Sequence, residues 1–111
     1  MFTVVETPIF QRRAEKLLAV AEREELIAHL AANPEAGELI VGAGGVRKVR
    51  WGGRSKGKRG GVRVIYYVAD ENTPLYALLI YGKDEQDDLT GEQRKTVKAF
   101  AEAIKAARRE R

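Results

Sequence analysis

The hydrophobic residues of the N-terminal third predict one short strand and two helices. Residues 2–6 are rich in β-branched side chains, which favours a strand. Thr7 and Pro8 then form a helix start, with Thr7 as the N-cap and Pro8 at the first helical position, where its missing N–H is harmless. Two sets of apolar residues follow at helical spacing: Phe10, Ala14, Leu17, Leu18 and Ala21, and then Leu26, Ile27, Leu30 and Ala31. Asn33-Pro34 ends the second helix, and the pair is expected to form a hairpin packed on a sheet.

The middle of the chain predicts a loop and three strands. Residues 37–45 are rich in glycine and are interpreted as a loop, with residues 39–41 as an apolar plug over the core. Strands are expected at 46–51, 62–69 and 75–83, consecutive and antiparallel. Because side chains alternate in a strand, Val49 and Trp51 should share the buried face and Lys48 and Arg50 the opposite face. Arg63 is the single charge of the central strand.

A third helix is predicted near the C-terminus. Thr90 and Gln93 have the spacing of a capping box, and an apolar stripe of Val97, Phe100, Ala101 and Ile104 follows. The predicted order is therefore β-α-α-β-β-β-α. This order favours an α+β fold, a small antiparallel sheet with an N-terminal helical hairpin on one face, built as one domain over residues 1–111.

The composition excludes several classes of protein. At 111 residues, 44% hydrophobic and 32% charged, the chain is expected to fold around one core. It contains no cysteine, which excludes disulfides, thiolate zinc sites and a cysteine nucleophile. No signal-peptide pattern and no apolar run of about 20 residues is present, so a cytoplasmic protein without a membrane partner is expected.

Positive charge is concentrated in residues 46–63. The chain has a net charge of +4, and this segment holds no acidic residue. Its eight cationic residues are Arg47, Lys48, Arg50, Arg54, Lys56, Lys58, Arg59 and Arg63. Such a concentration on a soluble domain indicates a surface that binds a polyanion, although a solvated loop would have the same composition.

Three motifs in this order resemble the RelE superfamily of toxins from type II toxin–antitoxin modules. They are Gly-Ala-Gly-Gly-Val-Arg-Lys-Val-Arg-Trp (42–51), Gly-Lys-Arg-Gly-Gly-Val-Arg-Val-Ile-Tyr-Tyr (57–67) and Tyr-Gly-Lys-Asp-Glu-Gln-Asp-Asp-Leu-Thr (81–90). The chain is most similar to the HigB-like branch. The resemblance implies a small sheet with two helices on one face and a concave basic face opposite. It also implies a ribonuclease that cuts messenger RNA in the ribosomal decoding site, and an antitoxin partner, expected to be a helix-turn-helix protein.

The resemblance also implies catalytic residues. Basic residues on the strand of Lys48 and Arg50, and an arginine at the position of Arg63, belong to the active site of RelE-type toxins, and Lys83 matches a lysine of the family. Arg63 is expected to stabilise the phosphorane-like transition state. Lys48 is a candidate base or a phosphate ligand. Lys83 is either a catalytic residue or a salt-bridge partner of the neighbouring carboxylates.

The remaining candidates would bind RNA. Arg54, Lys56, Lys58 and Arg59 lie in the glycine-rich loop and are expected to hold phosphates, and Tyr67 could stack on a base or belong to the core. Tyr81 is assigned to packing. The chain has one histidine, His29, interpreted as an ordinary helix residue, and no carboxylate cluster on the basic segment to hold magnesium. Cleavage through the RNA 2′-hydroxyl without metal or cofactor is therefore expected, with the proton donor to the leaving oxygen unassigned.

Three other functions fit parts of the pattern. ParE-like relatives share the fold and poison DNA gyrase without nuclease chemistry, but the basic residues at Lys48, Arg50 and Arg63 argue against this reading. A non-catalytic module that binds RNA or the ribosome would need only the basic surface. An inactive protein held by its antitoxin, with the C-terminal helix as the docking element, is the third.

Overall fold

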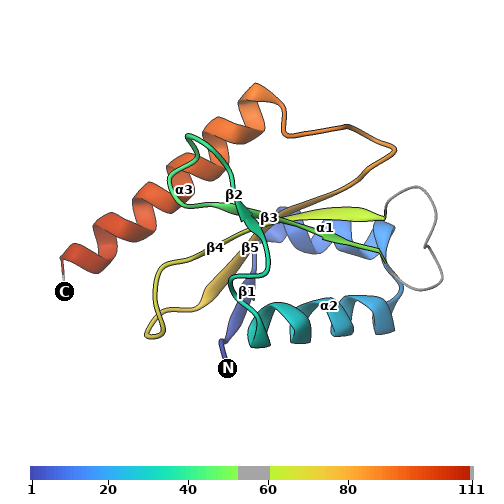
Figure 1. The fold of residues 1–111 in the computed structure, drawn as a ribbon, viewed down its shortest axis with the longest axis horizontal. Coiled ribbons are helices and arrows are strands. Elements are labelled where there is room, and N and C mark those ends of the chain that lie inside the picture. Colours follow the sequence, from blue (N-terminus) through green and yellow to red (C-terminus); the bar gives the residue numbers. More distant parts are fainter. Residues whose placement is uncertain (53–60, 111) are drawn as a thin grey trace.

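The computed structural model describes residues 1–52 and 61–110. Its elements follow the expected order, with one short strand added (Figure 1). They are β1 (Val4–Glu6), α1 (Pro8–Leu17), α2 (Val20–Ala32), β2 (Glu38–Leu39), β3 (Arg47–Trp51), β4 (Val62–Val68), β5 (Leu75–Gly82) and α3 (Gly91–Arg109). The α+β class predicted from the sequence is confirmed. No helix within the described residues is both long enough and apolar enough to cross a membrane.

The strands form one open sheet in the order β1-β5-β4-β3-β2. The β2–β3, β3–β4 and β4–β5 pairs are antiparallel, as expected for consecutive strands. The first strand instead runs parallel to β5, with Val4 opposite Leu75. The sheet is therefore mixed, and the N-terminal strand forms one of its two edges.

Local capping fixes where the helices begin. The Thr7 hydroxyl accepts a hydrogen bond from the Phe10 N–H at 3.2 Å, and α1 starts at Pro8 as predicted. At the other end of the chain, the Thr90 hydroxyl accepts from the Gln93 N–H at 3.0 Å, and the Gln93 side chain accepts from the Thr90 N–H, which completes the predicted capping box. The first helix ends at Leu17, so Ala21 belongs to α2 rather than to α1.

The sheet separates two hydrophobic cores. The first core lies under α1 and α2 and includes Phe10, Ala14, Leu26, Leu30, Val62, Val64, Tyr66, Leu75, Ala77 and Ile80. The second core lies between the opposite face and α3 and includes Ala43, Val46, Ile65, Tyr67, Leu78, Leu79, Tyr81, Leu89, Val97 and Ala101. Figure 1 shows α3 well apart from α1 and α2. The face expected to be open and basic is therefore partly covered by a second apolar layer.

The segment after α2 forms the predicted plug only in part, because Ile40 alone of residues 39–41 packs against the second core. Glu38–Leu39 pairs with β3 as an edge strand, and Leu39 and Val41 are 60% and 91% exposed. Ala43 and Val46 are buried in their place. Between them, Gly44 and Gly45 have φ angles of 75° and 100°, in the left-handed region that favours glycine. The glycines therefore allow a turn between the two residues that enter the second core.

A β-bulge between Ile65 and Tyr66 changes which residues of β5 face the second core. Ile65 lies opposite Leu79, whereas the next residue, Tyr66, lies opposite Ala77, so Leu78 is the extra residue of β5. An extra residue reverses the alternation of the side chains that follow it. Ala77 thus packs in the first core, while Leu79 and Tyr81 pack in the second.

Candidate active site

The candidate site lies where β3 and β4 pair, toward Trp51 and Val62. Arg50 lies directly opposite Arg63, and Lys48 lies opposite Ile65. Val49 and Trp51 pack against the first core on the other face. The predicted alternation of β3 is confirmed, and Lys48, Arg50 and Arg63 share the face of the sheet that carries the second core.

Arg50 and Arg63 form a like-charged pair across the two strands. Directly opposed residues of an antiparallel pair have Cβ atoms about 4.5–5.5 Å apart, and like charges in this position are destabilising. Arg50 is exposed, whereas Arg63 is only 6% exposed. The expectation that Arg63 lies on an open surface is therefore wrong. Within the described residues, its guanidinium donates a long hydrogen bond of 3.4 Å to the Val62 carbonyl.

The two lysines of the predicted site are paired with carboxylates of the loop between β5 and α3. Lys48 Nζ lies 3.3 Å from Asp88 Oδ1, and Lys83 Nζ lies 2.8 Å from Asp87 Oδ1. The backbone N–H of Leu89 lowers the pKa of Asp88, with a further contribution from Lys48, and Lys83 lowers the pKa of Asp87. A lysine acts as a base when neighbouring cations disfavour its charged form, but Lys48 contacts a carboxylate, which favours that form. Binding a phosphate therefore fits its position better than acting as a base.

Helix α1 fixes the turn that carries these carboxylates. Arg13 Nε donates to the Ile80 carbonyl at 2.6 Å, and its Nη2 donates to Glu85 Oε1 at 2.5 Å. Glu85 Oε1 also accepts from the Gly82 N–H at 2.6 Å, and this hydrogen bond is the largest cause of the lowered pKa of Glu85. The end of β5 is therefore paired with β4 and is also hydrogen-bonded to Arg13 of α1.

Gly61 fixes the neighbouring end of β4. Its φ angle is 63°, and a Cβ atom on it would lie 2.5 Å from the carbonyl oxygen of Trp51. The Gly61 carbonyl accepts from the Lys83 N–H at 3.1 Å. Glycine at this position lets β3, β4 and the end of β5 approach each other closely beside Arg63.

Tyr81 lies next to these cations, although it was assigned to packing from the sequence. It pairs directly with Arg63 across β4 and β5, and its side chain is fully buried. Among the residues that the structure describes, its hydroxyl has no hydrogen-bond partner. Burial raises the pKa of Tyr81, with Asp88 as the next contribution, so its hydroxyl stays protonated near neutral pH. The bulge in β5, which the alternation of the sequence does not reveal, places it on this face.

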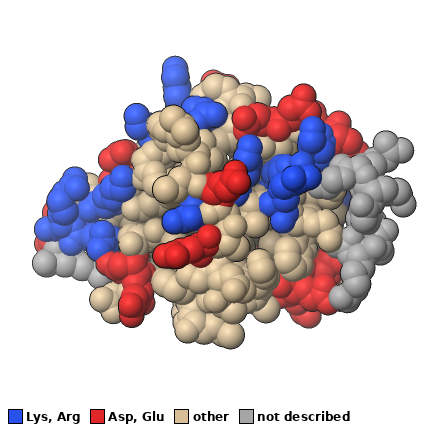
Figure 2. Space-filling view, in the orientation of Figure 1, with Lys and Arg blue, Asp and Glu red and all other residues tan. Residues whose placement is uncertain are grey.

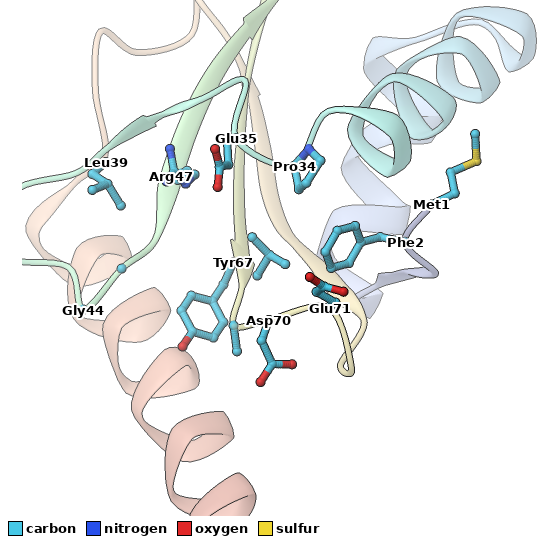
Figure 3. A pocket seen from close by; sticks show the side chains of 13 residues that line it. Met1, Phe2, Pro34, Glu35, Leu39, Gly44, Arg47, Tyr67, Asp70 and Glu71 are labelled. Carbon is cyan, nitrogen blue, oxygen red and sulfur yellow. The ribbon is translucent and has the colours of Figure 1, made fainter.

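The structure places the other RNA-binding candidates elsewhere or does not describe them. Arg54, Lys56, Lys58 and Arg59 fall outside the described residues. Tyr67 is 4% exposed in the second core, and burial raises its pKa, which favours packing over stacking on a base. It lines a cavity of about 680 Å³ at the other end of the sheet, together with Glu35, Arg47, Asp70 and Glu71 (Figure 3). Three carboxylates make this cavity a poor site for RNA.

Charges of both signs cover the face shown in Figure 2. Lys and Arg side chains alternate with Asp and Glu and do not form one continuous basic patch. Within residues 1–52 and 61–110, no group of three or more His, Asp or Glu side chains is placed to hold a metal ion. The chemistry of the described site is that of cations, carboxylates and one buried phenol.

Comparison with known proteins identifies the fold. No family model matches the chain. Among solved structures, it is similar to a double arginine-to-alanine mutant of the E. coli toxin RelE in the free state, with a TM-score of 0.55 and 20% sequence identity. The match covers 78% of this chain and 87% of that chain. The fold of this protein is therefore the RelE fold, as the motifs implied.

Proposed function

We propose that this protein is a toxin of a type II toxin–antitoxin module, of the HigB-like branch, and that it cuts messenger RNA on the ribosome. The observation that carries the proposal is the pair of opposed arginines, Arg50 and Arg63, with Lys48 on the same strand face. Two opposed guanidinium groups offer positive charge and several hydrogen-bond donors, which is the chemistry that binds a phosphate. The RelE fold supports the same reading, since the solved neighbour is itself named a toxin.

The proposed reaction is cleavage through the RNA 2′-hydroxyl, without a metal. The 2′-hydroxyl gives its proton to solvent water as its oxygen forms a bond to phosphorus. The bond from phosphorus to the 5′-oxygen breaks, and that oxygen takes a proton from solvent water, so the products are a cyclic phosphate and a 5′-hydroxyl. Arg63 stabilises the negative charge on the phosphorane-like transition state, where a fixed cation in a desolvated position acts strongly. Lys48 and Arg50 bind phosphate oxygens, and Lys83 contributes once its pairing with Asp87 opens.

The proposed partners follow from this function. We expect the ribosome and its message as the substrate complex, in the cytoplasm. We also expect an antitoxin, of helix-turn-helix type, encoded beside the gene. The adjacent reading frame and co-purification of its product would test the second expectation.

The test is primer extension on a translated message after the protein is induced. The wild-type protein should arrest translation and produce cuts in ribosome-engaged messages. Arg63→Ala should lower cleavage on the order of a hundredfold, because one preorganised cation is lost. Arg63→Lys is a second variant in case the alanine variant fails to fold, because it keeps the charge but not the planar guanidinium. It should also cleave poorly, and its circular dichroism spectrum should match that of the wild-type protein. Lys95→Ala on the exposed side of α3 is the matched control and should cleave normally.

The possible results separate the competing functions. Normal cleavage by a folded Arg63→Lys protein would remove Arg63 from the mechanism. Loss of DNA supercoiling without RNA cuts would instead show a gyrase poison. Binding to RNA without cuts would show a non-catalytic module.

A further inference from the structure

The hydroxyl group of Tyr81 is unexplained by packing. Phenylalanine fills the same volume without a polar atom, and a buried hydroxyl without a partner is unfavourable. Tyr66, one strand away and equally buried, shows what a structural tyrosine does in this protein. Its hydroxyl donates to the Pro34 carbonyl at 2.8 Å and accepts from the Gly37 N–H at 2.8 Å. Among the described residues, no such partner meets the Tyr81 hydroxyl.

The position of Tyr81 relates it to the cationic pair. It is the residue of β5 that lies opposite Arg63, and Arg63 in turn lies opposite Arg50. One row across three strands therefore carries Arg50, Arg63 and Tyr81 on the same face. The β-bulge determines this row, because regular alternation from Ala77 would have turned Tyr81 toward the first core. Bulges are common next to active sites, where they redirect a side chain.

The chemistry of this row selects the kind of ligand. Two guanidinium groups supply positive charge and hydrogen-bond donors, and a protonated phenol adds one further donor without charge. A group whose negative charge is shared by several oxygen atoms satisfies all three, and the two non-bridging oxygens of a phosphodiester share one such charge. The Asp88 carboxylate, 3.3 Å from Lys48, is the anion that this end of the site holds in the free protein.

We infer that Tyr81 is a further catalytic residue, whose hydroxyl donates a hydrogen bond to a non-bridging oxygen of the RNA phosphate bound by Arg63. This inference rests on the proposed function, since it assumes that RNA is the substrate. The hydroxyl is covered in the free protein, so the phosphate reaches it only when surface side chains move aside. The Lys48–Asp88 pair, whose carboxylate is 52% exposed, opens in this step as the phosphate replaces the carboxylate at Lys48.

The test compares Tyr81→Phe with the wild-type protein in two assays. The first is the rate of cleavage of a ribosome-bound message, which should fall roughly ten- to a hundredfold, mainly in kcat, because a donor that strengthens in the transition state is lost. The second is the affinity for a short 2′-O-methyl RNA, which cannot be cleaved through its 2′ position, and this affinity should fall severalfold. The melting temperature of Tyr81→Phe should match or exceed that of the wild-type protein, since the change removes only a hydroxyl that has no partner among the described residues. Tyr76→Phe, on the same strand and outside the row, is the matched control and should change neither assay.

The outcomes distinguish this inference from the proposed function. If the wild-type protein cleaves and Tyr81→Phe cleaves and binds equally well, Tyr81 has no catalytic role, and the proposed function stands. If the wild-type protein binds the 2′-O-methyl RNA but cuts no message, while Tyr81→Phe binds it more weakly, Tyr81 is a phosphate ligand and the nuclease proposal fails. If the wild-type protein neither cuts nor binds RNA, both are overturned.

Discussion

Two buried tyrosines on neighbouring strands differ in what their hydroxyl groups do. Tyr66 ties the central strand to the segment after α2 through Pro34 and Gly37. Burial raises the pKa of Tyr66, and the hydrogen bond from Gly37 opposes this effect, so the hydroxyl keeps its proton and donates to Pro34. Tyr81 has a raised pKa for the same reason, and none of the described residues accepts its proton. The same side chain therefore makes two structural hydrogen bonds at one position and none to the described residues at the other.

Tyr66→Phe should destabilise the protein by about 1–3 kcal/mol, because it leaves a buried backbone donor and a backbone acceptor without their partner. Urea unfolding followed by circular dichroism measures this effect. Tyr81→Phe is the matched comparison, being the same change at a buried site, and its free energy of unfolding should stay close to the wild-type value. Equal losses in the two variants would contradict the distinction.

At the scale of elements, the loop between β5 and α3 determines how much of the positive charge is available. This loop pairs Asp88 with Lys48 and Asp87 with Lys83. Helix α1 holds its first residues through Arg13, and the capping box at Thr90 holds its end. A short segment with both ends fixed keeps its carboxylates beside the lysines, so any anionic ligand must compete with these carboxylates for the two cations.

Asp88→Asn should therefore bind RNA more tightly than the wild-type protein, severalfold at low salt, with the difference decreasing as salt screens the charges. Fluorescence anisotropy of a labelled 2′-O-methyl RNA at several salt concentrations provides the measurement. Asp84→Asn makes the same change of charge in the same loop without a contact to Lys48, and it should raise the affinity less. Equal effects of the two substitutions would show that only net charge matters.

For the whole molecule, carboxylates with lowered pKa values make stability depend on pH. The group consists of Asp70, Glu85, Asp87 and Asp88. A hydrogen bond from a backbone N–H is the largest cause of the lowered pKa for three of them: that of Asn72 for Asp70, that of Gly82 for Glu85 and that of Leu89 for Asp88. For Asp87, the largest cause is the hydrogen bond from Lys83. Since the folded pKa lies below the unfolded value of 3.8 for Asp or 4.5 for Glu, this stability is fully present above those values.

The melting temperature should therefore change little between about pH 7 and pH 5, and it should fall as the pH drops below about 4.5 and through the folded pKa values. Circular dichroism melts across this range test the expectation. Glu85→Gln removes one of the titrating groups, and its melting temperature should fall less steeply with acid. A melting temperature that rises on acidification would contradict the role of these carboxylates.

The parts that the sequence predicts correctly depend on short-range patterns. Thr7 and Thr90 act on residues within one helical turn, and the alternation of Lys48 and Val49 is read within a single strand. The second core and the place of Tyr81 depend instead on where β5 gains an extra residue. Because residues 75–81 are apolar on both faces, their hydrophobic pattern gives no sign of a shift in register. The burial of Arg63, which is 6% exposed, is likewise a property of the assembled fold that its place in the sequence does not reveal.

The parallel pairing of β1 with β5 sets the order in which a growing chain can fold. Thr7, directly after β1, donates a hydrogen bond to the Leu78 carbonyl, 71 residues away in sequence. At about 5–20 residues per second, a ribosome makes that stretch in roughly 4–14 s, during which β1 has no strand to join. The partner strand of β1 is β5, which also carries Tyr81. The nascent chain therefore completes this edge of the sheet, and with it the row of Arg50, Arg63 and Tyr81, only late in its synthesis.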